Sequence, residues 1–368
     1  MSSRIRSELL ELNMGPQHPS THGVLRLAVI LDGEVVVECH PDLGYLHRGV
    51  EKLAEMRTYI QFTPITDRLD YLASMLGNAA YIGAVEKLGG IEVPERAEFI
   101  RVIMMELQRI ASHLIFFGTM GLDLGATTPF LYAMREREDI LDLFEMTCGA
   151  RLTYNYFRPG GVSRDLPEGF CGKAKTYIKK QREKLVEYDD LLTGNQIFIA
   201  RTRNIGIISA EDAVNYSLSG PSLRASGVAY DVRKVDPYSV YDRLDWQVVT
   251  RNEGDTRARF LCRVDEIRQS LNIVEQALDM LPEGELSCKT PLKLKLPEGE
   301  VYHHIESARG DVGVYLVSDG TDKPYRLKWR APSFINLGAL NQMVVGRKIE
   351  DIVAVLGSID VVLGEVDR

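Results

Sequence analysis

Residues 13–23 read NMGPQHPSTHG, and the rest of the chain is best interpreted outward from this stretch. It holds two prolines, two glycines and two histidines. That composition excludes a regular helix or strand and predicts a stiff loop. Stiff loops on rigid scaffolds often carry chemistry, and histidine changes its charge near neutral pH, so His18 and His22 are candidate site residues. From the loop alone, a surface turn with two solvated imidazoles is the favoured interpretation.

The residues after the loop predict a small antiparallel sheet. VLRLAVI, residues 24–30, is rich in branched side chains and is typical of a strand. Asp32-Gly33 then predicts a tight hairpin into VVVEC, residues 35–39, because these residue types accept the positive φ angles of a type I′ turn. The histidine loop is therefore expected at the edge of a sheet.

Bulk composition is that of an ordinary globular protein. The 368 residues are 45% hydrophobic and 26% charged, with a net charge of -8, which argues against nucleic acid as a partner. No apolar run reaches the roughly 18 residues of a membrane helix. The first residues, MSSRIRSELLEL, lack the apolar core of a signal peptide. A cytoplasmic protein is expected, and docking on a membrane complex stays open.

The five cysteines argue against a metal or iron–sulfur centre held by this chain alone. They are odd in number, widely spaced and form no C-x-x-C pair; they are Cys39, Cys148, Cys171, Cys262 and Cys288. Reduced and mostly buried thiols are expected.

Long helices are expected through the middle of the chain. The first is predicted to begin at Thr66 as N-cap and to end at Gly89-Gly90, which places Tyr71 in its first turn. The second runs from Pro94 to about residue 118 and the third from Pro129 to about residue 149. His113, in the second, is interpreted as a core histidine with a satisfied hydrogen bond.

Asp123 lies in the predicted link between the second and third helices, where the sequence reads GLDLG. A carboxylate between apolar segments either caps a helix or pairs with a buried base. Residues 195–245 are interpreted as an ordered loop with a short helix after Ser209. A long helix over 255–281 and short strands around VYHHIES, GVYLVSDG and YRLKWR follow, so a mixed, α+β fold is expected.

Several long motifs together resemble the D-subunit family of NADH–quinone oxidoreductase, the respiratory complex I, in its bacterial form. They are NMGPQHPSTHGVLRL, LGYLHRGVEK, PITDRLDY, RPGGVSRDLP, SGPSLRASG, ARGDVGVYLVSDG and GSIDVVLGEVDR. The resemblance extends from Asn13 to Arg368. It implies an α+β fold like the large subunit of nickel–iron hydrogenases, with a central bundle of long helices, a small N-terminal antiparallel sheet and short peripheral strands. It also implies a sheet with the quinone-site loop over residues 1–60 and a helical core over 61–368.

The hydrogenase relatives hold their metals with two C-x-x-C pairs, and this chain has other residues at the similar places. Asp70 and Ala73 stand at the first pair, and Val362 and Glu365 stand at the second. Thiolate ligation of nickel and iron is therefore excluded there. The resemblance implies that the metal cavity has become a cavity for an organic substrate.

The family's quinone-site roles carry over to His22, Tyr71 and Asp123. Tyr71 would donate a proton to one quinone carbonyl and His22 to the other, with Asp123 hydrogen-bonded to the imidazole. The loop residues His18, Ser20 and Thr21 would shape the quinone site, and Arg48 and Arg68 would lie near the partner's cluster. Thr153 stands where several members have a histidine tied to the pH-dependence of the cluster potential, so that property is not expected here.

The resemblance also implies partners. The chain would bind no cofactor by itself and would meet the complex I B subunit, which carries a [4Fe–4S] cluster, the C and I subunits, the membrane-embedded H subunit, and quinone as the substrate. It would lie peripherally on the cytoplasmic face of a bacterial cell membrane. Two alternatives stay open: a hydrogenase-type metalloenzyme, which the missing cysteines disfavour, and a non-catalytic scaffold protein of a hydrogenase-related oxidoreductase.

Overall fold

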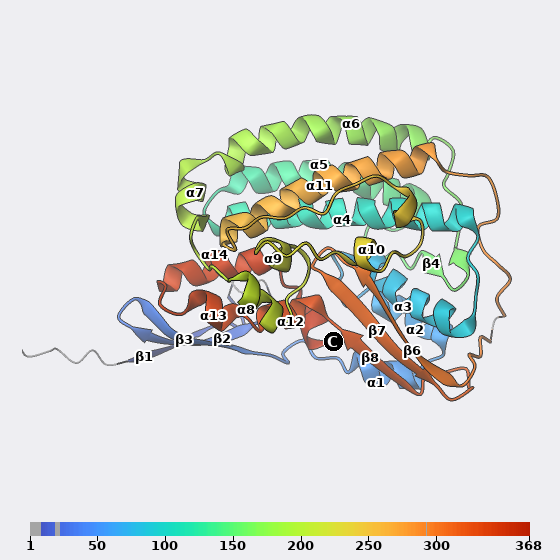
Figure 1. Cartoon of the computed structure of the whole chain (residues 1–368), viewed down its shortest axis with the longest axis horizontal. Coiled ribbons are helices and arrows are strands. Elements are labelled where there is room, and N and C mark those ends of the chain that lie inside the picture. The colour runs from blue at the N-terminus through green and yellow to red at the C-terminus, as the bar shows by residue number, and fades with distance from the viewer. Residues whose placement is uncertain (1–8, 19–22, 292) are drawn as a thin grey trace, which may run out of the picture.

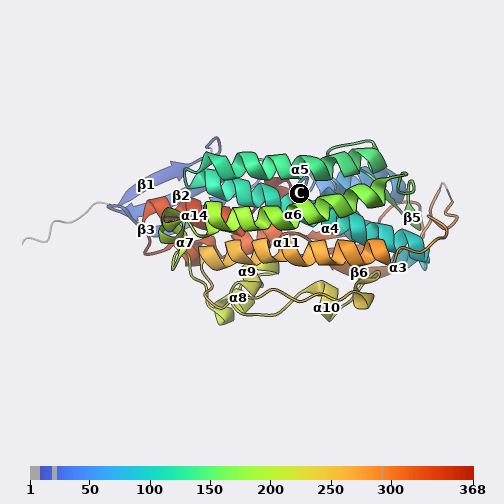
Figure 2. The same ribbon diagram turned by 90° about the horizontal axis from the view of Figure 1, so that it is seen from above.

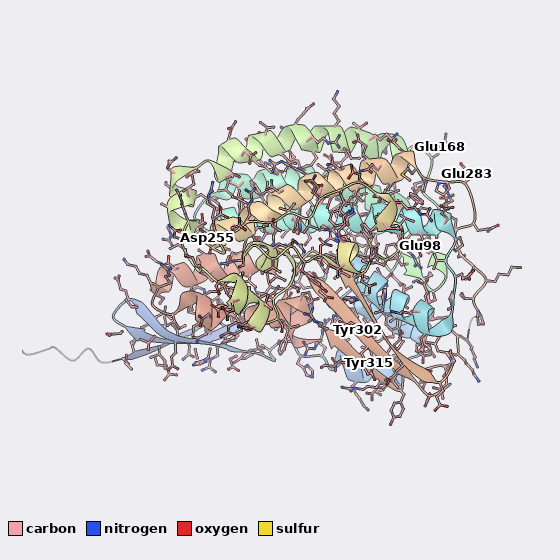
Figure 3. All side chains as sticks on the ribbon, in the orientation of Figure 1. Glu98, Glu168, Asp255, Glu283, Tyr302 and Tyr315 are labelled. Atoms are coloured by element: carbon pink, nitrogen blue, oxygen red, sulfur yellow. The ribbon has the colours of Figure 1, made fainter. Side chains whose placement is uncertain are left out.

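The computed structural model describes residues 9–18, 23–291 and 293–368. Four long helices pack together as a bundle, which makes up the upper layer of the molecule in Figure 1. They are α4 (Glu95–Asp123), α5 (Thr127–Cys148), α6 (Phe170–Tyr188) and α11 (Thr256–Asp279). Figure 3 places Glu98 and Asp255, near the beginnings of α4 and α11, at opposite ends of this layer, so the two helices are antiparallel.

Helix α4 is the centre of the layer because its sequence is apolar on nearly every face. Its buried residues run from Ala97 to Gly121 with few interruptions. It packs against both α5 and α11. Ring contacts tie the neighbours to it: Phe117 stacks on Tyr188 of α6, with ring centroids 4.3 Å apart. Such burial on all sides gives a rigid support for the segments below it.

The N-terminal sheet has the predicted hairpin. Strands β1 (Leu10–Met14), β2 (Arg26–Asp32) and β3 (Val35–Asp42) are antiparallel in the order β1-β2-β3. The alternating side chains Leu27, Val29 and Leu31 are buried. They share a hydrophobic core with the C-terminal helices α13 (Leu340–Val344) and α14 (Ile349–Ile359). The division of the chain at residue 60 stays a prediction.

A second antiparallel sheet lies at the other end of the molecule, below the helix layer (Figure 1). Its strands are β6 (Gly299–Glu306), β7 (Asp311–Ser318) and β8 (Arg326–Arg330), as the sequence predicts. Figure 3 labels Tyr302 and Tyr315, which face each other as a register pair on β6 and β7. A short pair, β4 (Phe157–Arg158) and β5 (Gly161–Val162), lies in the predicted Gly/Pro-rich connector.

The remaining helices are shorter than these four long helices. Three of them lie within residues 203–250, a segment that runs along the α11 side of the layer (Figure 2). These three are α8 (Ala210–Asn215), α9 (Gly220–Arg224) and α10 (Val232–Val235), and Ser209 caps α8 as predicted. The others are α1 (Val50–Met56), α2 (Tyr59–Thr66), α3 (Ser74–Gly89), α7 (Gln196–Thr202), α12 (Pro332–Leu337) and α15 (Leu363–Asp367), with π-helical and 3-10 turns at Asp189–Thr193 and Tyr241–Arg243. The predicted α+β class is confirmed.

The predicted start of the first long helix is wrong. Thr66 ends α2 instead of capping α3, and its hydroxyl donates to the carbonyl of Thr63, 2.7 Å away. The N-cap signal belongs to Thr58, which forms a capping box with Gln61 at the start of α2. Residues 67–73 form a turn between α2 and α3, so Tyr71 lies in that turn and not in a helix.

The boundary predicted after the second long helix is also wrong. Helix α4 continues to Asp123, five residues beyond the predicted end at Gly118. The two glycines in its last turns are tolerated because neighbours pack directly on them: a Cβ at Gly121 would lie 3.1 Å from a side-chain atom of Pro129. Asp123 is therefore the last helical residue of α4 and is half-buried.

Candidate functional site

A fully buried arginine organises the region where the turn 67–73, the β6–β7 turn and the C-terminus meet. Arg309 lies in the β6–β7 turn, and its Nη1 donates to Asp70 Oδ2 at 2.8 Å and to Ser112 Oγ at 3.0 Å. Its Nη2 donates to Asp360 Oδ1 at 3.3 Å and its Nε to the Asp360 carbonyl at 2.9 Å. We call Arg309, Asp70, Asp360 and Glu365 the Arg309 cluster.

Asp70 joins this cluster to the backbone of the turn. Its Oδ1 accepts hydrogen bonds from the amides of Leu72 and Ala73, each at 3.2 Å, just before α3 begins. Its other oxygen pairs with Arg309. Burial raises the pKa of Asp70, Arg309 lowers it, and Asp360 raises it again. One carboxylate thus fixes the turn that carries Tyr71, just before α3 begins.

Glu365, in α15, is held mainly by a serine. Ser333 of α12 contacts Glu365 Oε2 with its amide at 3.2 Å and its hydroxyl at 2.6 Å. The side chain is 1% exposed. Burial and the charge of Asp70 raise the pKa of Glu365, Ser333 and Arg309 lower it, and the net result is a pKa of about 7.

Helix α15 packs directly on the turn 67–73. A Cβ at Gly364 would lie 2.6 Å from the carbonyl oxygen of Leu69 and 3.2 Å from that of Arg68, so only glycine fits there without movement. Arg48 Nη2 donates to the same Arg68 carbonyl at 2.7 Å. The structure therefore brings the predicted residues Arg48 and Arg68 together at the surface, with both side chains exposed.

Tyr71 lies at the outer side of the Arg309 cluster. Its side chain is 38% exposed, and its backbone carbonyl accepts the Ser74 hydroxyl at 3.0 Å. Burial raises the pKa of the phenol, Arg309 lowers it and Asp70 raises it. The hydroxyl is therefore protonated at neutral pH, reachable from outside, and within the electrostatic influence of Arg309 and Asp70.

The described ends of the histidine loop lie against α15. His18 is exposed and forms an isolated antiparallel bridge with Gly23. A Cβ on Gly23 would lie 3.0 Å from Leu363 Cδ1, so the base of the loop rests on the helix that carries Glu365. Ser20, Thr21 and His22 lie outside the described residues. The predicted pairing of His22 with Asp123 stays a prediction.

A second buried acid supports the turn from the other side. Asp67 accepts the backbone amide of Asn155 at 2.6 Å, and burial raises its pKa to about 7. Thr153, two residues before Asn155, has a positive φ of 54° and donates its hydroxyl to the Leu152 carbonyl. The connector predicted as Gly/Pro-rich is thus fastened to the site by a hydrogen bond to Asp67.

Three site residues escaped the sequence patterns. Arg309-Gly310 predicts a turn and nothing more, because the acids that bind the arginine are far away in sequence. Asp360 ends α14 with a φ of 61°, a conformation usually given to glycine or asparagine. An acid at such a position, close to Glu365 in a short apolar segment, is the signal that points to it. Asp67 carries no comparable signal.

A larger ionic network lies deeper, between α4, α11 and β6. His113 is fully buried, and its Nε2 lies 3.0 Å from Glu266 Oε2, which confirms the prediction of a core histidine. Glu106 contacts Arg109 and Arg233, while Arg224 contacts Glu266 and Glu306. These are pairs of buried charges that compensate each other.

The described part of the chain contains no ready-made metal-binding site. Among residues 9–18, 23–291 and 293–368, no group of three or more His, Cys, Asp or Glu side chains is arranged to hold a metal ion. All five cysteines are free thiols, and burial raises the pKa of Cys39, Cys148 and Cys262 to about 12. Over the same residues, no helix is long and apolar enough to cross a bilayer.

Comparison with known proteins decides the family. The model of the respiratory-chain NADH dehydrogenase 49 Kd subunit matches residues 123–295 and 289–368. The chain belongs to this family. Proteins named as the D subunit of NADH-quinone oxidoreductase are similar to the chain over nearly their whole length. The relative in Clostridium beijerinckii is 53% identical over 364 residues, covering 99% of this chain and 98% of the relative. The relative in Desulforamulus reducens is 56% identical over 363 residues, covering 99% of each. The relative in Bacillus anthracis is 52% identical over 364 residues, covering 99% of this chain and 100% of the relative.

The 49 Kd subunit family assignment agrees with the observed architecture. The mixture of a helical layer with small antiparallel sheets is compatible with the hydrogenase large-subunit-like fold that the sequence resemblance implies. Asp70 and Glu365, which the sequence resemblance aligns with hydrogenase cysteines, both act on Arg309 in this 49 Kd family member. A guanidinium with its carboxylates therefore occupies the region that the resemblance assigns to metals.

Proposed function

We propose that the chain is the quinone-site subunit of a proton-pumping NADH–quinone oxidoreductase. The names of its relatives state an enzyme that acts on NADH and quinone. The observation that carries the proposal is Tyr71: a protonated phenol, partly exposed, on a turn fixed by Asp70 and by the packing of Gly364. Such a group is positioned to donate to a planar carbonyl substrate.

The reaction requires two electrons and two protons for each quinone. A [4Fe–4S] cluster held by the B subunit of the complex would supply the electrons. Tyr71 donates a proton to one carbonyl oxygen, and His22 donates to the other across the ring. Asp123 accepts a hydrogen bond from the imidazole and favours its charged form. Two O–H bonds form on the quinol. Tyr71 is left as a phenolate and His22 as a neutral imidazole.

The surrounding residues complete the proposed site. His18, Ser20 and Thr21 shape the loop over the headgroup, and the base of that loop rests on α15. Arg48 and Arg68, both exposed, face the cluster of the B subunit, where positive charge raises its potential. Residues 1–60 then supply the loop and 61–368 the helical support.

The assembly follows from the same proposal. The chain binds no cofactor by itself and contacts the B, C and I subunits of the peripheral arm and the membrane-embedded H subunit. It lies on the cytoplasmic face of a bacterial membrane. The chain contributes the tyrosine and histidine, while the partner contributes the electrons.

Tyr71→Phe in the assembled complex tests the proposal. The change removes one hydroxyl and almost no volume, so assembly and reduction of the partner's cluster are expected to stay normal. Quinone reduction should fall about 100-fold or more, because a positioned proton donor is lost. Tyr325→Phe, at a tyrosine that is 66% exposed before β8, is the matched control and should be neutral. Normal turnover in Tyr71→Phe would leave the chain as a non-catalytic scaffold protein.

A further inference from the structure

The Arg309 cluster holds more acids than bases. Asp70, Asp360 and Glu365 act on Arg309, and the pKa of Arg309, which burial alone would lower, is raised by these three carboxyl groups. The second guanidinium nearby is that of Arg263, whose Nε lies 3.6 Å from Asp360 Oδ2. Three carboxyl groups therefore face two guanidiniums, and one carboxyl is in excess.

Glu365 is the carboxyl without a guanidinium contact among the described residues. Asp70 and Asp360 each accept hydrogen bonds from Arg309, whereas the hydrogen bonds to Glu365 come from Ser333. An ionised carboxylate that is 1% exposed and held by a single serine would carry a large desolvation cost. The excess proton of the cluster therefore belongs on Glu365.

We propose that Glu365 stores a proton that is passed through Asp70 to the Tyr71 phenolate formed when quinone is reduced. This inference rests on the function proposed above. The O–H bond of Glu365 breaks as an O–H bond forms on Asp70, and that bond then breaks as the Tyr71 hydroxyl is restored. No electron moves in these steps, and Glu365 regains its proton from solvent.

The electrostatics set the direction of this transfer. Asp70 directly precedes Tyr71 in the turn, its carboxylate is bound by Arg309, and its charge acts on both Glu365 and Tyr71. Burial raises the pKa of Glu365 to about 7, while burial raises that of Tyr71 above its ordinary value near 10. A proton therefore moves downhill from the carboxylic acid to the phenolate. Arg309 stays charged throughout and stabilises whichever acid is ionised.

The groups facing Glu365 come from each element packed around it. Ser333 lies on α12, Asp70 in the turn 67–73, Arg309 in the β6–β7 turn and Asp360 at the end of α14. Its neighbour Asp367 is engaged elsewhere, since its carboxylate accepts the amides of Gly44 and Leu46 at 2.9 and 2.7 Å. Asp67, in the turn that carries Tyr71, also has a pKa raised to about 7, so the variants of Glu365 and Ser333 decide which acid gives the pH dependence.

Glu365→Gln in the assembled complex is the test, with Glu350→Gln, an exposed acid of α14, as the matched control. Glutamine keeps the volume and the acceptor for the Ser333 amide but holds no transferable proton. Infrared difference spectra of quinone reduction should show the loss of a protonated-carboxyl band in the wild type and in Glu350→Gln. That band should be missing in Glu365→Gln, and turnover should fall about 10-fold.

The pH dependence of turnover distinguishes a proton store at Glu365 from a purely structural role of this residue. Wild-type turnover should fall as pH rises through about 7, because Glu365 then loses its stored proton. Glu365→Gln should lack this limb. Ser333→Ala removes a hydrogen bond that stabilises the carboxylate, so the limb should move to higher pH. Ser333→Ala also tests the idea if Glu365→Gln does not assemble.

Two results would overturn the inference. One is a wild-type spectrum without a change at a protonated carboxyl that depends on Glu365. The other is an unchanged pH profile in both Glu365→Gln and Ser333→Ala. If quinone reduction is impaired in Tyr71→Phe but normal in Glu365→Gln and Ser333→Ala, only the proposal that Glu365 stores a proton is wrong. Normal turnover in Tyr71→Phe would instead contradict the proposed quinone-site function itself.

Discussion

At the scale of single residues, this fold depends on buried charges that neutralise each other. Glu106 is fully buried and contacts both Arg109 and Arg233. It also accepts the hydroxyls of Tyr241 and Ser270 at 2.6 Å each. Removing one partner of such a network leaves uncompensated charge in the core, which costs far more than an exposed ion pair contributes.

Glu106→Gln should therefore lower the free energy of unfolding by about 3–5 kcal/mol, because Arg109 loses its buried carboxylate and Arg233 is left with Asp231. The matched control is Glu145→Gln, since Glu145 is exposed and pairs with Arg151; its change should stay within about 0.5 kcal/mol. Urea unfolding of the full chain measures both. Equal effects in the two variants would show that the buried network contributes no special stability.

The pH dependence of this effect has a definite sign. Burial alone would raise the pKa of Glu106, but Arg109 and Arg233 lower it to about 2. A folded pKa below the unfolded value contributes stability above pH 4.5 that is lost as pH falls towards about 2. Glu106→Gln should flatten this part of the stability curve.

At the scale of elements, the site depends on the contact between α15 and the turn 67–73. A methyl group on Gly364 would meet the Leu69 carbonyl oxygen at 2.6 Å. That oxygen belongs to backbone next to Asp70 and Tyr71, so it cannot move away without moving the site.

Gly364→Ala should destabilise the chain by about 1–3 kcal/mol and reduce quinone turnover by displacing Tyr71. Gly172→Ala in α6 is the control, because a Cβ there meets nothing within 4 Å. Alanine in that helix should be neutral or slightly stabilising. Thermal unfolding and turnover of the assembled complex check both variants. A fully active Gly364→Ala complex would contradict the positioning role of this contact.

Local signals predicted the elements better than their ends. The Asp32-Gly33 hairpin, the cap at Ser209 and the helix over α11 follow from turn chemistry, capping and apolar periodicity. The start of α3 was missed because Thr66 looks like a cap, while the turn before that helix is fixed by Asp70, which binds the Ala73 amide and Arg309. A helix start that depends on tertiary contacts cannot be predicted from the spacing of residues in the sequence.

At the scale of the whole molecule, the site is assembled from segments that are distant in sequence. Asp70, Arg309 and Asp360 meet below the long-helix layer, and the C-terminus lies between the two sheets (Figure 1). The sequence predicted Tyr71, Arg48 and Arg68 through family resemblance. It did not predict Arg309 as the buried partner of Asp70 and Asp360, because nothing local marks an arginine in a hairpin turn as a buried centre.

The most direct test of the central claim is the structure of the assembled complex with a bound quinone analogue. The account predicts that one headgroup carbonyl lies within hydrogen-bond distance of the Tyr71 hydroxyl, with the loop over residues 13–23 covering the ring and Arg309 still bound to Asp70 beneath it. A headgroup bound away from Tyr71, or a Tyr71 covered by a neighbouring protein that leaves no access for quinone, would contradict it.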